Sequence, residues 1–173
     1  MPPKNPEAII HYEDTIQKRV SLDRIKPHVS STLATKLESI FGTDLIAVWG
    51  SNNSKANRAK FESMHEGDEV LIVKGKIIKF HGRIGDKVIS AGLSPELWHD
   101  LAGGPRAQSW DLIYFIVNPM EIEVPFAEFC SLVDYKSDFQ LHGFTKVSNA
   151  RLTRFYQKYT DLYSIVTRLA ERY

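Results

Sequence analysis

A chain of 173 residues with 43% hydrophobic and 25% charged residues is long and apolar enough to fold around a core without metal or disulfide crosslinks. A formal net charge of +1 excludes a protein coated with basic charge for non-specific nucleic-acid binding, although one local basic face is still compatible with it. The single cysteine, Cys130, excludes an internal disulfide and is expected to be a buried small hydrophobe in a cytoplasmic protein. No stretch approaches the roughly 20 apolar residues of a membrane span, so no membrane association is expected.

The first part of the chain is predicted to combine short strands with short helices. Residues 7–12 are expected to form a strand. Residues 30–42 carry apolar side chains at helical spacing, with serine at the start and Gly42 at the end, which predicts a helix. A buried strand is expected over residues 45–49 and a short helix over residues 54–64.

A hairpin and a long polar segment are expected next. Residues 68–73 and 76–84 are predicted to pair across a Lys-Gly turn, and residues 87–90 to extend that sheet. Residues 91–109 form a polar, glycine-containing excursion with one helical turn capped by Ser94. Long loops of this kind are usually functional or mobile.

The last part of the chain contains the most apolar strand candidate, residues 110–117, which is predicted to be central. A short helix is expected over residues 125–133 and an extended piece over residues 143–148. From Asn149 onward apolar residues recur at helical spacing, which predicts one long amphipathic helix with Ser148 as its N-cap.

Strands and helices are mixed without a regular β-α-β alternation, which favours an α+β fold: a small, strongly curved mixed sheet or open barrel flanked by helices. The chain, residues 1–173, is expected to be a single domain. Nucleophile-elbow, Walker, dinucleotide and metalloprotease motifs are missing, and no two of the six histidines have helical metal spacing. No catalytic residue, metal or cofactor is therefore expected.

Three tryptophans are the most informative side chains. Trp49 ends a strand at a polar turn, Trp98 lies in the long excursion, and Trp110 begins the central strand. Trp110 is expected to plug the end of the sheet, whereas Trp49 and Trp98 could each present a flat face to a nucleobase or a cationic group. Ser51 and Asn52 follow Trp49 and offer donors and acceptors for the polar edge of a base.

Two groups of polar and basic side chains could contact phosphate. Lys55 and Arg58 follow the polar turn. A second group surrounds the start of the last helix: Lys146, Ser148, Asn149, Arg151 and Arg154. The alternative for each group is an ordinary solvated face.

The stretch VWGSNNSKANRAKFESMHEGDEVLIV, with the following KGKIIKFHGRI, resembles the YTH/EVE branch of the PUA-like superfamily. A tryptophan, a small polar turn, a short helix and Met-x-x-Gly-Asp before a strand carry the resemblance. Members bind nucleic acid through a base held in an aromatic cage, and related domains occur at the N-terminus of McrB-type restriction proteins.

The resemblance implies roles for individual residues. Trp49 would be a cage wall, Ser51 would bond the base through its backbone, and Trp98 would supply the second wall, with Trp110 as the substitute. The first loop would contribute polar contacts to the base edge from Asp14, Thr15 and Arg19. Lys146 and Ser148 match the region that meets phosphate. An inserted segment, residues 26–44, departs from the family pattern.

The expected function is therefore a non-catalytic reader that holds a flipped methylated base of DNA. The resemblance favours N6-methyladenine, with 5-methylcytosine as the alternative. The chain would be the N-terminal module of a larger protein, with an AAA+ GTPase domain in the same chain and a partner nuclease. An RNA reader of the YTH kind, a small-ligand pocket on the same scaffold and a small hydrolase-like enzyme are the competing functions.

Overall fold

The computed structural model describes residues 6–42, 44–98, 110–136 and 138–173. The chain divides into two compact units: Met1–Asp68 with Arg83–Asn118, and Glu69–Gly82 with Pro119–Tyr173. Strands β3 (Ile77–Ile89) and β4 (Leu112–Pro125) run through both units. That the two units act as a single domain stays a prediction.

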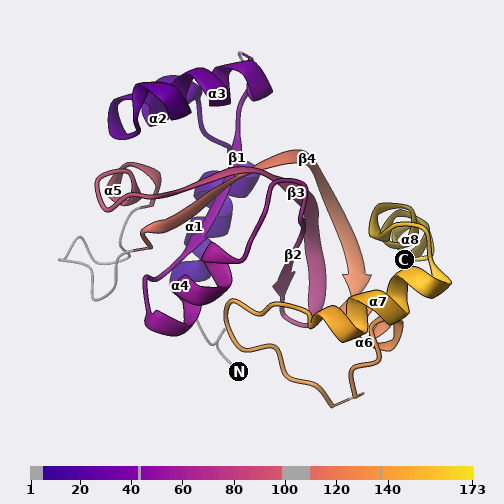
Figure 1. Ribbon diagram of the computed structural model, residues 1–173. Helices are drawn as coiled ribbons and strands as arrows, with labels where there is room; N and C mark the ends of the chain where they lie inside the picture. Colours follow the sequence, from indigo (N-terminus) through magenta and orange to yellow (C-terminus); the bar gives the residue numbers. More distant parts are fainter. Residues whose placement is uncertain (1–5, 43, 99–109, 137) are drawn as a thin grey trace. The chain divides into compact units, whose positions relative to one another are not determined.

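Four strands form one sheet in the order β1-β4-β3-β2 (Figure 1). Strand β1 (Ala47–Ser51) pairs antiparallel with the start of β4, so that Trp49 lies opposite Tyr114. The inner position of β4 confirms that its apolar residues belong to a central strand. Strand β2 (Glu69–Lys74) precedes β3 across a turn in which Gly75 and Lys76 both have positive φ, as the predicted hairpin required.

The first unit begins with helix α1 (Pro6–Tyr12), which continues into the π-helix η1 (Glu13–Gln17). The strand predicted for residues 7–12 is therefore wrong. Four buried positions show the reason, because they recur at helical spacing: His11, Tyr12, Thr15 and Ile16. The β-branched and aromatic side chains suggested a strand, but burial along one helical face determined the outcome.

Helices α2 (Leu22–Ile25) and α3 (Ser31–Phe41), joined by the 3₁₀-helix η2 (Lys26–His28), cover one side of the strands, and α1 lies on the other (Figure 1). The predicted ends of α3 are confirmed, since the Ser30 hydroxyl accepts from the Leu33 amide and Gly42 has φ +60°. The buried side chains of this layer meet those of β1 and β4, and they include Leu37, Ile46, Val48, Ile113 and Phe115.

Two further helices belong to the first unit. Helix α4 (Lys55–Glu62) begins after Ser54, whose hydroxyl accepts from the Asn57 amide. The side-chain amine of Lys87 on β3 donates to the carbonyls of Phe61 and Met64, so it holds the carboxyl end of α4. Helix α5 (Ser94–Leu97) is one turn long with Leu93 as its N-cap, one residue before the predicted Ser94.

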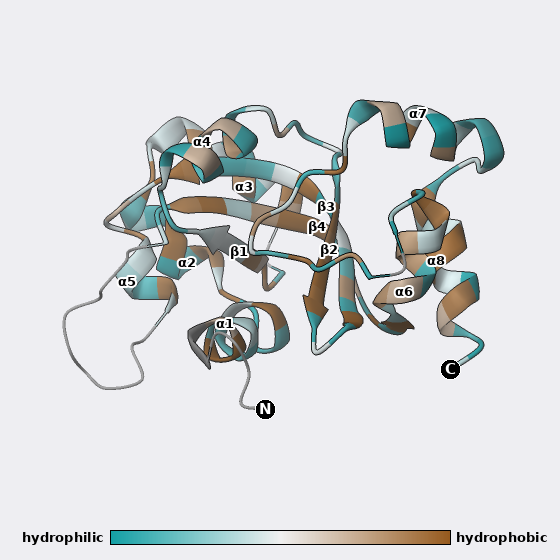
Figure 2. Ribbon diagram, turned by 90° about the horizontal axis from the view of Figure 1, so that it is seen from below, coloured by the Kyte–Doolittle hydropathy of each residue, from teal (hydrophilic) through white to brown (hydrophobic). Residues whose placement is uncertain are grey.

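The second unit packs helices α6 (Phe126–Leu132), α7 (Asn149–Lys158) and α8 (Leu162–Ala170) with parts of β3 and β4 around its own core. Figure 2 shows the hydrophobic residues along β2 and β4. Cys130 is buried in this core, as expected, and burial raises the pKa of its thiol.

The expectation of one long helix in this unit is wrong. The helix is interrupted, because Asp161 caps a new helix by accepting from the Ser164 backbone N–H at 2.7 Å. Residues 143–148 lie outside the helices and strands. Within the described residues no helix has the length and apolar character needed to cross a membrane.

Candidate nucleic-acid interface

The three tryptophans meet in one aromatic cluster in the first unit. Trp110 is the central ring: its centroid lies 5.4 Å from that of Trp49, 5.7 Å from that of Trp98 and 4.4 Å from that of His11. The Tyr12 ring meets Trp49 edge to face at 6.3 Å. The rings come from α1, β1, the end of α5 and the segment two residues before β4, so segments far apart in the sequence build the cluster.

Trp98 is the buried member of this cluster. Its side chain has 0% exposure, and its indole Nε1–H donates to the Thr15 hydroxyl at 3.0 Å. Thr15 is also 0% exposed and donates in turn to the His11 carbonyl at 2.9 Å. The exposed second wall expected at Trp98 is therefore not found, and neither side chain offers a surface to a ligand. The hydrogen bond between them satisfies the buried indole N–H of Trp98 and ties η1, through Thr15, to Trp98.

Gly50 makes room for the Trp98 ring. A Cβ atom at this position would lie 2.8 Å from Trp98 Cη2 and 2.8 Å from the Leu112 carbonyl oxygen. Only a residue without a side chain allows β1, β4 and the indole to approach this closely. Close packing therefore explains why position 50, in the Trp-Gly-Ser sequence, is a glycine.

Trp49 is partly exposed and lies on the face of β1 opposite to Val48 and Gly50, because side chains alternate along a strand. Ser51 shares the Trp49 face. Its hydroxyl oxygen is buried and has no hydrogen-bond partner among the residues that the structure describes. Tyr114 lies opposite Trp49 on this face, and burial raises the pKa of its hydroxyl, which keeps it neutral. A flat aromatic surface and an unused hydroxyl therefore occur two residues apart.

The predicted base-edge residues of the first loop lie on or next to η1, which packs against β1. Asp14 pairs with Lys18 through a 3.1 Å contact on η1. Arg19 is partly exposed and adopts a left-handed backbone, φ 56°, just after η1. Their contact with a base stays a prediction.

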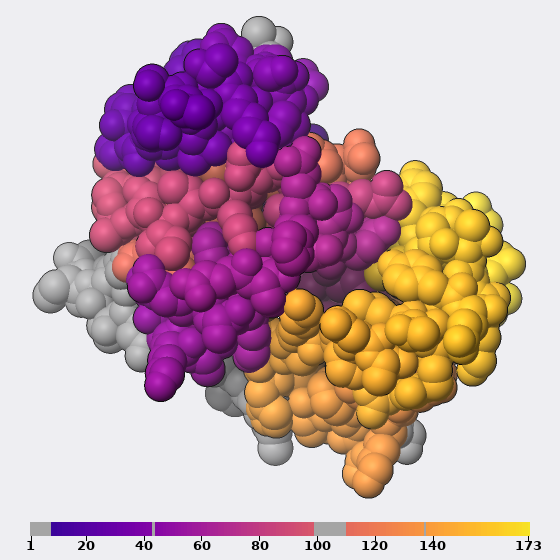
Figure 3. All heavy atoms as spheres, in the orientation of Figure 1, coloured from indigo at the N-terminus to yellow at the C-terminus, as the bar shows by residue number. Residues whose placement is uncertain are grey.

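The Lys55 and Arg58 side chains are exposed on α4, which lies on the face in view in Figure 3. Arg58 Nε lies 3.8 Å from a carboxylate oxygen of Glu62, and Lys55 has no ion-pair partner in the described part of the chain. Both cations belong to the unit that holds Trp49 and Ser51. The turn between β1 and α4 is fixed by Asn57, which the sequence analysis did not single out.

The second predicted phosphate group belongs to the other unit. Lys146 and Ser148 are exposed there. The Arg151 guanidinium instead donates to the carbonyls of Val133 and Asp134, and it lies 4.5 Å above the Tyr135 ring. This arginine is already engaged in joining α7 to the end of α6.

Arg154, a member of the same predicted group, and Lys158, which was not predicted, lie further along the same helix. Arg154 Nε lies 2.9 Å from the Asp134 carboxylate and Lys158 Nζ lies 4.0 Å from it. The Arg154 hydrogen bond, followed by the charge of Lys158, holds the pKa of Asp134 below its usual range. Positions 151, 154 and 158 share one helical face, which is the signal that spacing alone could have given.

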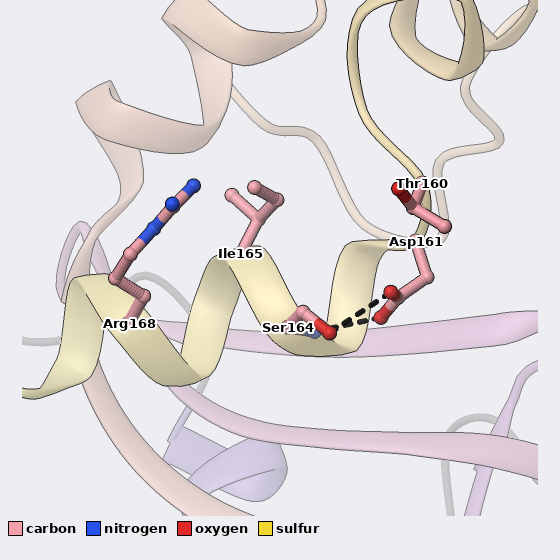
Figure 4. Close-up of a pocket in the computed structure, with 5 residues that line it drawn as sticks. All are labelled: Thr160, Asp161, Ser164, Ile165 and Arg168. Atoms are coloured by element: carbon pink, nitrogen blue, oxygen red, sulfur yellow. Dashed lines mark hydrogen bonds between the residues drawn. The ribbon is translucent and has the colours of Figure 1, made fainter.

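A pocket in the second unit is lined by Thr160, Asp161, Ser164, Ile165 and Arg168 (Figure 4). Both Asp161 carboxylate oxygens accept hydrogen bonds from Ser164, so this acid acts as a helix cap. None of the residues predicted to contact nucleic acid lines the pocket. Across the described ranges, no group of three or more histidine, cysteine or acidic side chains could hold a metal ion.

No protein-family model matches the sequence, and no curated protein is similar to it. Among solved structures, the chain is similar to the N-terminal domain of Thermococcus gammatolerans McrB bound to m5C DNA. The TM-score is 0.58 and the identity is 16%, over 89% of this chain and 91% of that one. The chain therefore shares the fold of that domain, which confirms the expectation of an α+β fold.

Proposed function

We propose that this protein is a non-catalytic reader of a methylated base in DNA, and that the base stacks on the exposed face of Trp49. The observation that carries the proposal is the pairing of a partly exposed indole with the unused, buried Ser51 hydroxyl on one strand face. The fold supports it, because the similar McrB domain was solved with m5C DNA.

The chemistry of such a site matches a base taken out of the duplex. Stacking on an aromatic ring contributes roughly 1–3 kcal/mol per base. Flipping a base costs a few kcal/mol, so stacking must be supplemented by hydrogen bonds to the polar edge. The Ser51 hydroxyl can donate or accept, and Asn52, Asp14 and Arg19 lie on neighbouring segments.

Trp110 gives the site its preference for a methyl group. Its ring is partly exposed and stands at 86° to that of Trp49, so the two indoles form a corner. An apolar methyl group directed toward this corner is removed from water, which contributes about 1 kcal/mol. Trp110 thus takes the role that the resemblance gave to Trp98.

The DNA backbone would meet Lys55 and Arg58 next to the base site, and Lys146, Ser148 and Arg151 in the second unit. Such contacts supply affinity and position but little sequence information. Arg151 contributes through the face that its internal bonds leave exposed. Cutting and GTP hydrolysis would belong to an AAA+ domain of the same chain and to a partner nuclease in the cytoplasm.

The identity of the methylated base is decided by titration. Fluorescence anisotropy would be measured with matched labelled duplexes that contain unmodified sequence, 5-methylcytosine or N6-methyladenine, and with the corresponding RNA. The family resemblance favours N6-methyladenine, and the ligand of the similar structure favours 5-methylcytosine. Tighter binding of either methylated duplex than of its unmodified match supports a DNA reader, and preference for methylated RNA supports the YTH-type alternative. Equal binding of all probes removes the proposal.

A further inference from the structure

We propose that Asn57 is a positioning residue for the base site: it holds the turn after Ser51 in the conformation that reading a methylated base requires. The inference rests on the proposed function, and it assigns a task to a side chain that is not expected to touch the base.

Two hydrogen bonds carry the inference. Asn57 Nδ2 donates to the Asn52 backbone carbonyl at 3.2 Å and to Asn52 Oδ1 at 2.9 Å. Both bonds are partly buried and reach back five residues, from the first turn of α4 to the residue that follows β1. Asn57 therefore links the helix to both the backbone and the side chain of a predicted base-edge residue.

The pattern also fixes which way the two amides point. A backbone carbonyl can only accept, so the Asn57 atom beside it must be the NH₂ group. The Asn52 atom that receives the second bond must then be its oxygen. Asn57 thus sets the orientation of the Asn52 amide as well as the path of the backbone.

The turn needs this support because sheet pairing ends just before it. Ser51 opposite Leu112 is the last pair of β1 with β4. Beyond it, residues 52–54 lead directly into α4. The Ser54 hydroxyl caps this helix by accepting a hydrogen bond from the backbone N–H of Asn57 at 3.3 Å. One residue therefore takes part in both the cap and the turn, and a shift of the turn would move the Ser51 hydroxyl relative to the Trp49 face.

The test compares Asn57→Ala and Asn57→Asp with the control Asn53→Ala. Asn53 is an exposed asparagine of the same turn. Alanine removes the donor without harming the helix. Aspartate keeps the shape and suits the first turn of a helix, but it also lacks the donor. Anisotropy titrations with methylated and unmodified duplexes, thermal unfolding, and amide hydrogen exchange of residues 51–54 would be measured for each.

Both Asn57 variants are expected to bind the methylated duplex about tenfold more weakly, which corresponds to the loss of one to two hydrogen bonds. The ratio of methylated to unmodified affinity should fall with it. Exchange of the turn amides should rise, while the thermal midpoint stays within a few degrees of that of the parent chain. The Asn53→Ala variant should retain both the ratio and the exchange rates.

Four results would overturn the inference. Unchanged exchange in both variants would show that Asn57 does not hold the turn. Faster exchange with an unchanged affinity ratio, or a lower midpoint with an unchanged ratio, would show a structural role only. If the parent chain binds the two duplexes equally, the proposed function is wrong, and with it the role of Asn57 in reading the base. The exchange rates would still show whether Asn57 holds the turn.

Discussion

The Trp110 ring meets the Trp49 ring edge to face, with centroids 5.4 Å apart and planes at 86°. Because the two indoles already touch, a base cannot lie between them unless they separate. The two rings therefore form a corner. Under the proposed function, a base stacked on Trp49 would direct one edge toward Trp110, and a methyl group on that edge is the feature that we expect the corner to distinguish.

Because the backbone at Gly50 lies so close to Trp98 and Leu112, adding one methyl group at this position is predicted to destabilise the fold. Gly50→Ala would place Cβ 2.8 Å from both Trp98 Cη2 and the Leu112 carbonyl, and the backbone carbonyl cannot turn away. We expect a loss of about 1–3 kcal/mol in the free energy of unfolding, measured with a denaturant. Gly92→Ala is the matched control, since the nearest atom lies at 4.0 Å. Equal stability of the two variants would contradict the packing role of Gly50.

The bond between Trp98 and Thr15 predicts a difference between two similar substitutions. Thr15→Val keeps the shape but leaves the buried Trp98 indole N–H without its acceptor, at a cost of about 1–3 kcal/mol. Thr15→Ser keeps the hydroxyl and loses only a methyl group, worth about 1 kcal/mol. Denaturant unfolding should therefore rank the serine variant above the valine variant. The reverse order would show that the hydroxyl contributes nothing.

Lys55 and Arg58 on α4 are predicted to raise the affinity for methylated and unmodified DNA by the same factor. Lys55→Ala combined with Arg58→Ala should weaken binding of methylated and unmodified duplexes by the same factor. The slope of log affinity against log salt should become shallower by about 1 for each lost phosphate contact. Lys26→Ala removes a cation of the same unit that is paired with Glu38, and it serves as the control. A change in the methyl preference itself would indicate that α4 contacts the base instead.

The side-chain carboxyl of Asp134 is predicted to titrate at a lower pH than an ordinary aspartate. Its carboxyl has a depressed pKa in the folded chain, chiefly because Arg154 bonds to it. The stabilisation is present above the ordinary unfolded pKa and is lost as pH falls through the lower folded value. Arg154→Met should move the carboxyl titration, followed by carbon-13 NMR, back upward. An unchanged midpoint would show that Arg154 is not the main cause.

Sequence reasoning succeeded where the determining interactions are local. The Ser30 cap and the Gly42 terminus depend on residues within one helical turn, and the structure places both as predicted. The apolar central strand was also evident, because burial on both faces leaves a continuous hydrophobic run.

Other features depend on contacts that the sequence does not display. Residues 7–12 became helical because Tyr12 and the residues that follow it bury one helical face, which overrides strand propensity. Trp98 was expected to be exposed because its surroundings are polar, yet Gly50 and Thr15, from distant segments, enclose it. The role of Asn57 could not be found from spacing, since a five-residue link from a helix to a preceding turn has no periodic signature.

The central claim is that the methylated base rests on Trp49, and affinity ratios test it most directly. Anisotropy would be measured for the parent chain, Trp49→Ala and Tyr156→Ala, the last being an exposed aromatic of the second unit. We predict that Trp49→Ala binds methylated and unmodified duplexes equally while its salt-sensitive background binding persists, and that Tyr156→Ala keeps the parent ratio. A methyl preference that survives the loss of the Trp49 indole would contradict the account.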